Sequence, residues 1–177
     1  KKLYQGYFPD RRIIFHTIHK AEYQGKVIQY SAHTMSRKCV EQIGADTVFD
    51  KIEKITGKIP VISFKMANKG DIYFGKTEGF DEYCGKDIAV VGTPHSKPLF
   101  YKLLACELGY IKKNVSYTLN CRRVVRNGYD FKIMSFADPD IQNLQLFLIE
   151  TDLEQAIGRS RVLRKTCTVY VFSNYPC

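Results

Sequence analysis

The sequence predicts an α/β domain in which a mostly parallel sheet is flanked by helices and carries one antiparallel hairpin. Short runs of β-branched and aromatic residues alternate with segments whose apolar residues recur every three or four positions. Asn127-Gly128, between two alternating runs, is the strongest hairpin signal in the chain. With 177 residues, 45% of them hydrophobic and 25% charged, the chain is long enough to bury a proper core.

The first half of the chain predicts strands around one helix. Residues 12–19 and 26–32 are rich in β-branched and aromatic residues and predict two strands that could pair as a hairpin. Residues 36–55 predict a single helix that ends near Gly57 and Pro60, because the apolar positions have helical spacing. The apolar runs at 61–64, 71–74 and 87–92 predict three short strands.

The second half begins with a helix opened by Pro98, running to Leu108 and stopped by Gly109. Residues 116–125 and 129–136 form the two arms of the predicted hairpin. Asp138 begins a long helix, and residues 167–172 are the last strand.

The whole chain is basic, with a formal net charge of +9 and an isoelectric point near 9.2. This favours a polyanionic partner, DNA or RNA, over the alternative of a merely lysine-rich surface. No apolar run is long enough to cross a bilayer and the first residues do not resemble a signal peptide, so we expect no membrane partner and a cytoplasmic or nucleoid-associated location. The six scattered cysteines are expected to be free thiols.

The run from Gln155 to Arg164 follows the long predicted helix and contains Gly158, Arg159 and Arg161 as well. Guanidinium groups offer a forked, permanently charged set of donors that suits phosphate oxygens. Gln155 and Arg159 are four apart and would share a helix face, and Gly158 would let a backbone or nucleotide approach closely. The alternative is a basic helix end that complements the macrodipole.

This run resembles motif VI of the superfamily 2 helicases and translocases, Gln-x-x-Gly-Arg-x-x-Arg. Gln155, Gly158 and Arg159 match it, whereas the last arginine of the pattern falls on Val162, between Arg161 and Arg164. The resemblance implies that Arg159 points at the γ-phosphate of ATP held by a neighbouring domain. It also implies that Gln155 positions that arginine or the attacking water, and that Arg161 or Arg164 supplies a second phosphate contact.

Two further stretches fit the same family. Residues 61–65 are similar to motif IV, and residues 76–81 are similar to the end of motif V, where Gly-x-Asp follows a threonine. The resemblance implies that Gly79 and Asp81, with Gly158, line the nucleotide cleft. By their position, the side chains expected to contact the nucleic-acid backbone are Ser63, Lys65, Lys76 and Thr77.

The phosphate-binding loop and acidic box of a first RecA-like domain are absent from the sequence. ATP and Mg²⁺ are therefore expected to be bound mainly by a first RecA-like domain of the same parent protein, because the abrupt ends of the sequence suggest a fragment. We expect the chain alone to be inactive as an ATPase. Residues 1–60 have no confident alignment, and residues 61–177 are predicted to be the helicase C-terminal domain with a hairpin inserted around 115–137.

Two other functions are alternatives to a helicase or translocase that acts in DNA replication. The hairpin carries Arg122, Arg123 and Arg126 among aromatic residues, a pattern typical of ribbons that track a phosphate backbone, so a non-enzymatic nucleic-acid-binding module is the main alternative. The acidic residues Asp71, Asp81, Glu82 and Asp87 suggest a metal nuclease less strongly. His16 and His19 face opposite sides of a predicted strand and are a poor metal pair.

Overall fold

A five-stranded parallel sheet lies at the centre of the computed structural model, which describes residues 7–14, 22–76, 81–110 and 117–177. The strand order is β1-β7-β4-β2-β3, and all four pairings are parallel. The strands are β1 (Lys26–Tyr30), β2 (Val61–Ser63), β3 (Ile72–Tyr73), β4 (Ile88–Val91) and β7 (Thr168–Phe172). The predicted fold class, an α/β domain with a mostly parallel sheet and a separate hairpin, is confirmed.

Helices cover both faces of this sheet. Along β4, Ile88 and Val90 belong to the core formed with α5 (Pro139–Ile157), whereas Ala89 and Val91 belong to the core on the side of α2 (Arg37–Ile43) and α3 (Ala45–Thr56). All four of these β4 side chains are fully buried. A strand buried on both faces has no polar positions to alternate with apolar ones, which is why 87–92 is a continuous apolar run.

The predicted helix over 36–55 is two helices, so this prediction is wrong in its continuity. Ser36 caps α2 by accepting a hydrogen bond from the backbone N–H of Cys39. Gly44 then has φ 91°, a backbone conformation that interrupts helical hydrogen bonding and that glycine adopts at little cost. The apolar spacing continues across the break because both helices pack on the same face of the sheet.

Residues before position 61 contribute to this same sheet. β1 pairs with β7 along its whole length, from Lys26 opposite Thr168 to Tyr30 opposite Phe172, and the Tyr30 and Phe172 rings stack at 4.8 Å. Of the first predicted strand, residues 12–14 are in no strand and residues 15–19 lie outside the described residues. β1 forms one border of the sheet.

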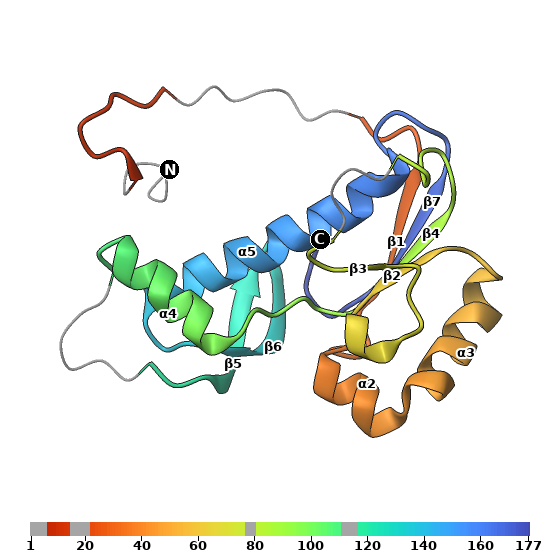
Figure 1. Cartoon of the computed structure of the whole chain (residues 1–177), viewed down its shortest axis with the longest axis horizontal. Helices are drawn as coiled ribbons and strands as arrows, with labels where there is room; N and C mark the ends of the chain where they lie inside the picture. The colour runs from red at the N-terminus through yellow and green to blue at the C-terminus, as the bar shows by residue number, and fades with distance from the viewer. Residues whose placement is uncertain (1–6, 15–21, 77–80, 111–116) are drawn as a thin grey trace.

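The second half of the chain follows its prediction closely. α4 (Pro98–Glu107) precedes the hairpin of β5 (Asn120–Arg126) and β6 (Tyr129–Ser135). Asn127 and Gly128 both have positive φ, 50° and 79°, as a type I′ turn requires. Figure 1 shows α4 and the hairpin beside the N-terminal half of α5, while the C-terminal end of α5 reaches the start of β7.

Two simpler features complete the description. All six cysteines are free thiols in this structure. Within residues 7–14, 22–76, 81–110 and 117–177, no helix combines the length and apolar character needed to span a bilayer.

Candidate functional sites at the two edges of the sheet

The amino edge of the sheet brings together two segments that the sequence singled out separately. Parallel strands begin at the same edge, so residues 81–87, before β4, and residues 158–167, before β7, become neighbours. The Gly85 N–H donates to the Ser160 carbonyl at 2.9 Å. Asp87 accepts from the Thr168 N–H at 2.7 Å. These bonds hold the segment before β4 against the segment before β7.

Asp81 and Arg161 form an ion pair across this junction. Arg161 Nη2 donates to Asp81 Oδ1 at 2.5 Å, and both side chains are exposed. The hydrogen bond from Arg161, helped by the nearby charge of Arg159, lowers the pKa of Asp81. The carboxylate therefore stays ionised in neutral solution.

The other residues of the arginine run lie around the end of α5. Gln155 is exposed in its last turn, whereas Arg159 is half-buried in a short 3-10 turn, Gly158–Ser160. The two residues are thus not on one continuous α-helix. The Nε of Arg159 is buried without a hydrogen-bond partner among the described residues.

Gly158 and the rest of the predicted nucleotide contacts give a mixed outcome. A Cβ placed on Gly158 would have no described atom within 4 Å, so no close approach within this chain requires glycine there. Arg164 is exposed. Gly79, predicted beside Asp81, and Thr77, predicted on the nucleic acid, lie outside the described residues.

A groove of about 750 Å³ runs from this edge between β1 and the C-terminal half of α5. Gly158, Arg161 and Arg164 line one end, and Glu150 and Glu154 are also among its walls. The groove therefore carries charges of both signs. Gln155, Arg159 and Asp81 are not among its lining residues.

At the opposite, carboxyl edge, the loops that follow the strands are tied together by buried hydroxyl groups. Thr93 Oγ1 donates to the Thr34 carbonyl at 2.7 Å and lies 2.7 Å from Ser173 Oγ, so the serine hydroxyl donates to the threonine. Ser63 Oγ donates to the Val91 carbonyl at 2.9 Å. Thr93, Ser173 and Ser63 are all buried.

Aromatic packing adds to this rigid edge. The Phe64 ring lies 5.4 Å from that of Phe74 and has the Arg37 guanidinium 5.2 Å above it. A Cβ on Gly92 would come within 2.5 Å of the Phe64 ring, so the loops after β2 and β4 are in close contact. Arg37, far from Phe64 in sequence, is thereby placed beside it.

The charges at the two edges differ. The residues that directly follow the five strands include no Asp or Glu: these are residues 31–37, 64–66, 74–76, 92–97 and 173–174. They carry four exposed cations, Arg37, Lys65, Lys76 and Lys97. The amino edge mixes the arginine run with Asp71, Asp81, Glu82 and Asp87. Sequence reasoning selected Lys65 and Lys76 but missed Arg37 and Lys97, although each comes soon after a strand.

Ser63 was predicted to contact nucleic acid, and the structure does not support this. Its side chain is fully buried and its hydroxyl is used within the sheet. Ser63 is buried because β2 lies inside the sheet, between β4 and β3, whereas Lys65 follows the end of the strand and is exposed.

His95 lies at the carboxyl edge beside the buried Gln145. Gln145 Nε2 lies 3.4 Å from His95 Nδ1 and donates to the Met134 carbonyl at 2.9 Å, which connects this edge to the hairpin. Burial, with a smaller effect from Arg37, lowers the pKa of His95 to about 4. The imidazole is therefore neutral at pH 7.

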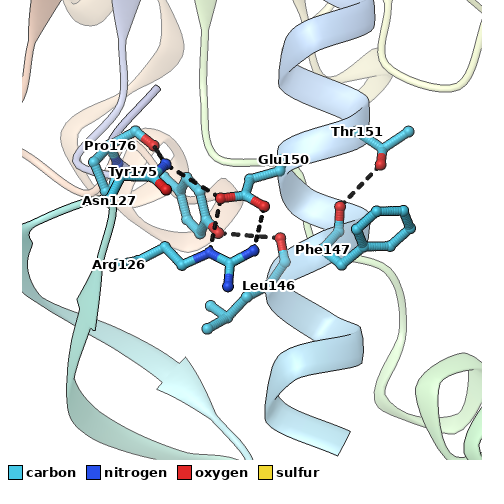
Figure 2. A network of polar contacts seen from close by, with 8 residues as sticks. All are labelled: Arg126, Asn127, Leu146, Phe147, Glu150, Thr151, Tyr175 and Pro176. Carbon is cyan, nitrogen blue, oxygen red and sulfur yellow. Dashed lines mark hydrogen bonds and ion pairs between the residues drawn. The ribbon is translucent and has the colours of Figure 1, made fainter. Parts of the chain in front are cut away.

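The hairpin tip is fastened to α5, as Figure 2 shows. Arg126 Nε donates to Glu150 Oε1 at 2.8 Å, and Asn127 Nδ2 donates to the same carboxylate and to the Pro176 carbonyl, each at 3.2 Å. Burial, the largest single effect, would raise the pKa of Glu150, but the hydrogen bond and charge of Arg126, together with hydrogen bonds from Asn127 and Tyr175, lower it overall. Arg126 is thus occupied by a partner within the chain.

The other two hairpin arginines point to different sides. Arg123 lies on the exposed side and bonds Asp130, with Nε 2.7 Å from Oδ1. Arg122 lies on the same side of β5 as the buried Val124, and its Nε is buried without a described partner. Their role in nucleic-acid binding stays a prediction. Among the basic residues of β5 and β6, Arg123 and its cross-strand neighbour Lys132 are exposed, whereas Arg122 and Arg126 are half-buried.

The acidic residues do not converge. Asp71 accepts from the Val61 N–H at 2.8 Å, Asp87 from Thr168, and Asp81 from Arg161. Within the described part of the chain, no three His, Cys, Asp or Glu residues are placed to hold a metal ion. His16 and His19 lie outside that part.

Comparisons with protein-family models, with curated proteins and with solved structures found no match to this chain.

Proposed function

We propose that this chain is the second RecA-like motor domain of an ATP-dependent nucleic-acid helicase or translocase. The observation that carries the proposal is the contact between residues 81–87 and 158–168. Asp81, the last residue of the motif V-like stretch, and Arg161, in the motif VI-like run, meet at this edge as an ion pair.

In this function, the amino edge faces the nucleotide. Arg159 stabilises charge on the γ-phosphate of ATP that a first RecA-like domain holds with Mg²⁺. Arg159 is half-buried and its buried Nε has no hydrogen-bond partner among the described residues, so this part of the chain leaves some of the hydrogen-bonding capacity of the guanidinium unused. Gln155 lies one turn earlier and positions the arginine or the attacking water.

The carboxyl edge faces the DNA or RNA. Arg37, Lys65, Lys76 and Lys97 supply cations along loops whose hydroxyl groups and aromatic rings are already packed. Rigid loops lose little conformational entropy on binding, and lysine and arginine neutralise phosphates without reading sequence. The nucleotide and the nucleic acid would then be bound at opposite edges of one sheet.

The test is the Arg159→Ala variant of the parent protein that contains both RecA-like domains. We expect ATPase activity to fall about 1,000-fold or more, as for other arginine fingers, with nucleic-acid affinity changed less than about twofold. Arg159→Lys should stay inactive, because an ammonium lacks the forked donor geometry. Lys54→Ala, an exposed cation on α3, is the matched control. An Arg159→Ala variant that keeps its ATPase activity would refute the proposal.

The basic carboxyl edge also favours a second candidate, a non-enzymatic nucleic-acid-binding module. This candidate predicts that the isolated chain binds DNA or RNA with strong salt dependence and that no ATPase partner exists. If the isolated chain does not bind DNA or RNA, and the Arg159→Ala variant of the parent protein keeps its full ATPase activity, neither function is supported.

A further inference from the structure

The strand β1 forms one border of the five-stranded sheet, and no strand of the described residues pairs with its outer side. The Lys26 N–H donates at 2.9 Å to the residue before β7, and the Tyr30 carbonyl accepts at 3.2 Å from the residue after it. Because the backbone groups of a strand alternate in direction, those of Val27 and Gln29 point to the open side. β1 therefore offers backbone donors and acceptors to a further strand.

The opposite border of the sheet does not offer the same opportunity. There β3 has two residues, whereas β1 has five. Proteins commonly protect a sheet edge by making the strand short or by adding charged residues or proline. β1 contains no proline, and its one charged residue is Lys26, at the first position. Its other exposed side chains are apolar or aromatic: Val27, Ile28 and Tyr30.

More exposed apolar residues lie beside this edge, on the face of the sheet that α2 and α3 cover. Ile28 and Tyr30 are two positions apart, so their side chains point to the same face, where Tyr30 stacks on Phe172. An apolar groove of about 220 Å³ adjoins Tyr30 and is lined by Ile43 and Ile55, which are both exposed. No Asp or Glu is among its described lining residues. Contiguous apolar surface of this kind is typical of an interface.

The one uncharged polar side chain of β1 leaves the edge open. Gln29 Nε2 donates to the Ser173 and Tyr175 carbonyls at 2.8 Å and 2.6 Å. Gln29 Oε1 accepts from the Cys177 N–H at 3.3 Å. These bonds hold the side chain against the end of the chain and hold β1 in an extended form, so little conformational entropy remains to be lost when another strand pairs with it.

We propose that β1 pairs with β1 of a second copy of this chain, so that two sheets join into one across a two-fold axis. This inference goes beyond the proposed function and does not depend on it. A two-fold axis between identical strands makes them antiparallel. With the axis at Ile28, Val27 of each copy exchanges both backbone hydrogen bonds with Gln29 of the other. With the axis at Val27 or at Gln29, only one pair of outward residues within β1 would bond.

The side chains of β1 are complementary to themselves in this register. Lys26 lies opposite Tyr30 of the second copy, so the lysine stem and ammonium pack on the ring. Ile28 lies opposite Ile28 of the second copy, which joins two apolar side chains at the axis. No like charges within β1 face each other. A strand of another protein could use the same edge, but this self-complementarity favours a second copy.

The experiment is sedimentation velocity of the 177-residue chain over a wide range of concentrations. We expect a monomer–dimer equilibrium in which the dimer predominates by on the order of 100 μM, as for a small interface. Raising the NaCl concentration from about 50 to about 500 mM should strengthen association, because salt screens the net charge of +9 on each copy. A chain that stays monomeric at on the order of 1 mM would leave the edge to another protein, and the proposal would be wrong. A dimer that salt weakens would be held by charge pairs, which also contradicts it.

The variant Val27→Pro removes an N–H that points outward, a position at which edge strands tolerate proline. We expect the fold to be retained, as measured by circular dichroism, and dimerisation to weaken at least about tenfold, because each dimer loses two backbone hydrogen bonds. Leu103→Asp, at an exposed apolar residue of α4, is the control and should not change dimerisation. If Val27→Pro dimerises as the wild type does, or if Leu103→Asp abolishes the dimer, the interface lies elsewhere.

A charge exchange at Ile28 tests the register itself. Ile28 is 39% exposed, so a charged side chain there can reach water. Ile28→Asp and Ile28→Lys each place two like charges at the axis, and each variant alone should be monomeric. An equimolar mixture should restore a dimer with one copy of each variant, because opposite charges then face each other. If both variants are folded and their mixture stays monomeric, the axis does not pass through Ile28 and the proposal is wrong.

Discussion

The two edges of the sheet are formed by the same strands, but their paired polar groups are buried at one edge and exposed at the other. At the carboxyl edge, polar groups are buried and paired with each other, as in Thr93 with Ser173, while residues 31–37, 64–66, 74–76, 92–97 and 173–174 carry exposed cations and contain no Asp or Glu. At the amino edge, the polar pairing is on the surface, as in Asp81 with Arg161. Buried pairs give rigidity, whereas exposed pairs contribute little to stability and are free to exchange partners.

The largest expected effect concerns the charges of the carboxyl edge. Replacing Arg37, Lys65, Lys76 and Lys97 by Gln should weaken binding to a single-stranded oligonucleotide about 100-fold. The slope of log K against log salt should become shallower by about 0.7 for each phosphate that the variant no longer neutralises. Fluorescence anisotropy at several salt concentrations measures both quantities.

The matched control removes the same charge elsewhere by changing Lys54, Lys58, Lys86 and Lys165 to Gln. If this control variant binds as weakly as the first, net charge decides binding and the carboxyl edge is not the interface.

The next effect is a pH dependence of stability that originates at His95. The folded protein keeps the His95 pKa near 4, against 6.5 for the ordinary side chain. As the pH falls from 6.5 to 4, the unfolded chain binds a proton that the folded chain does not, so stability decreases, by less than about 3 kcal/mol. Urea unfolding between these pH values, compared with His95→Asn, isolates this contribution. An equally steep decrease in His95→Asn would exclude His95 as its source.

The smallest effects compare one polar pair from each edge. Thr93→Val removes a buried hydroxyl that serves Thr34 and Ser173, and should cost about 1–2 kcal/mol of unfolding free energy. Asp81→Asn at the exposed pair should cost less than about 0.5 kcal/mol. Chemical denaturation measures both, and equal decreases would show that the edges do not differ as described.

Much of the fold follows from local patterns. Three features depend only on a few neighbouring residues, wherever the segment lies in the fold. They are the Asn127-Gly128 turn, the Asp138 cap and the continuous apolar run of β4. The break at Gly44 escaped prediction because apolar spacing continued through it. Backbone conformation at a glycine is not part of a hydrophobic pattern.

The candidate sites were predictable only in part. The sequence identified the arginine run and Asp81 as separate features, and Lys65 and Lys76 as cations after strands. It could not assign Arg126 to Glu150 or Arg161 to Asp81, because each pair joins segments far apart in the chain. It also could not show that Ser63 is buried, since the position of β2 between β4 and β3 is set by the pairing of distant strands.

By itself, the sequence determined the fold class, most of the order of elements after residue 60, the basic net charge and the presence of the arginine run. These properties depend on composition and on neighbours within a few positions along the chain. Only the tertiary structure decided which charges remain free, which are paired, and at which edge each lies. Parallel strand pairing sets those outcomes, because it brings the starts of distant strands to one edge and their ends to the other.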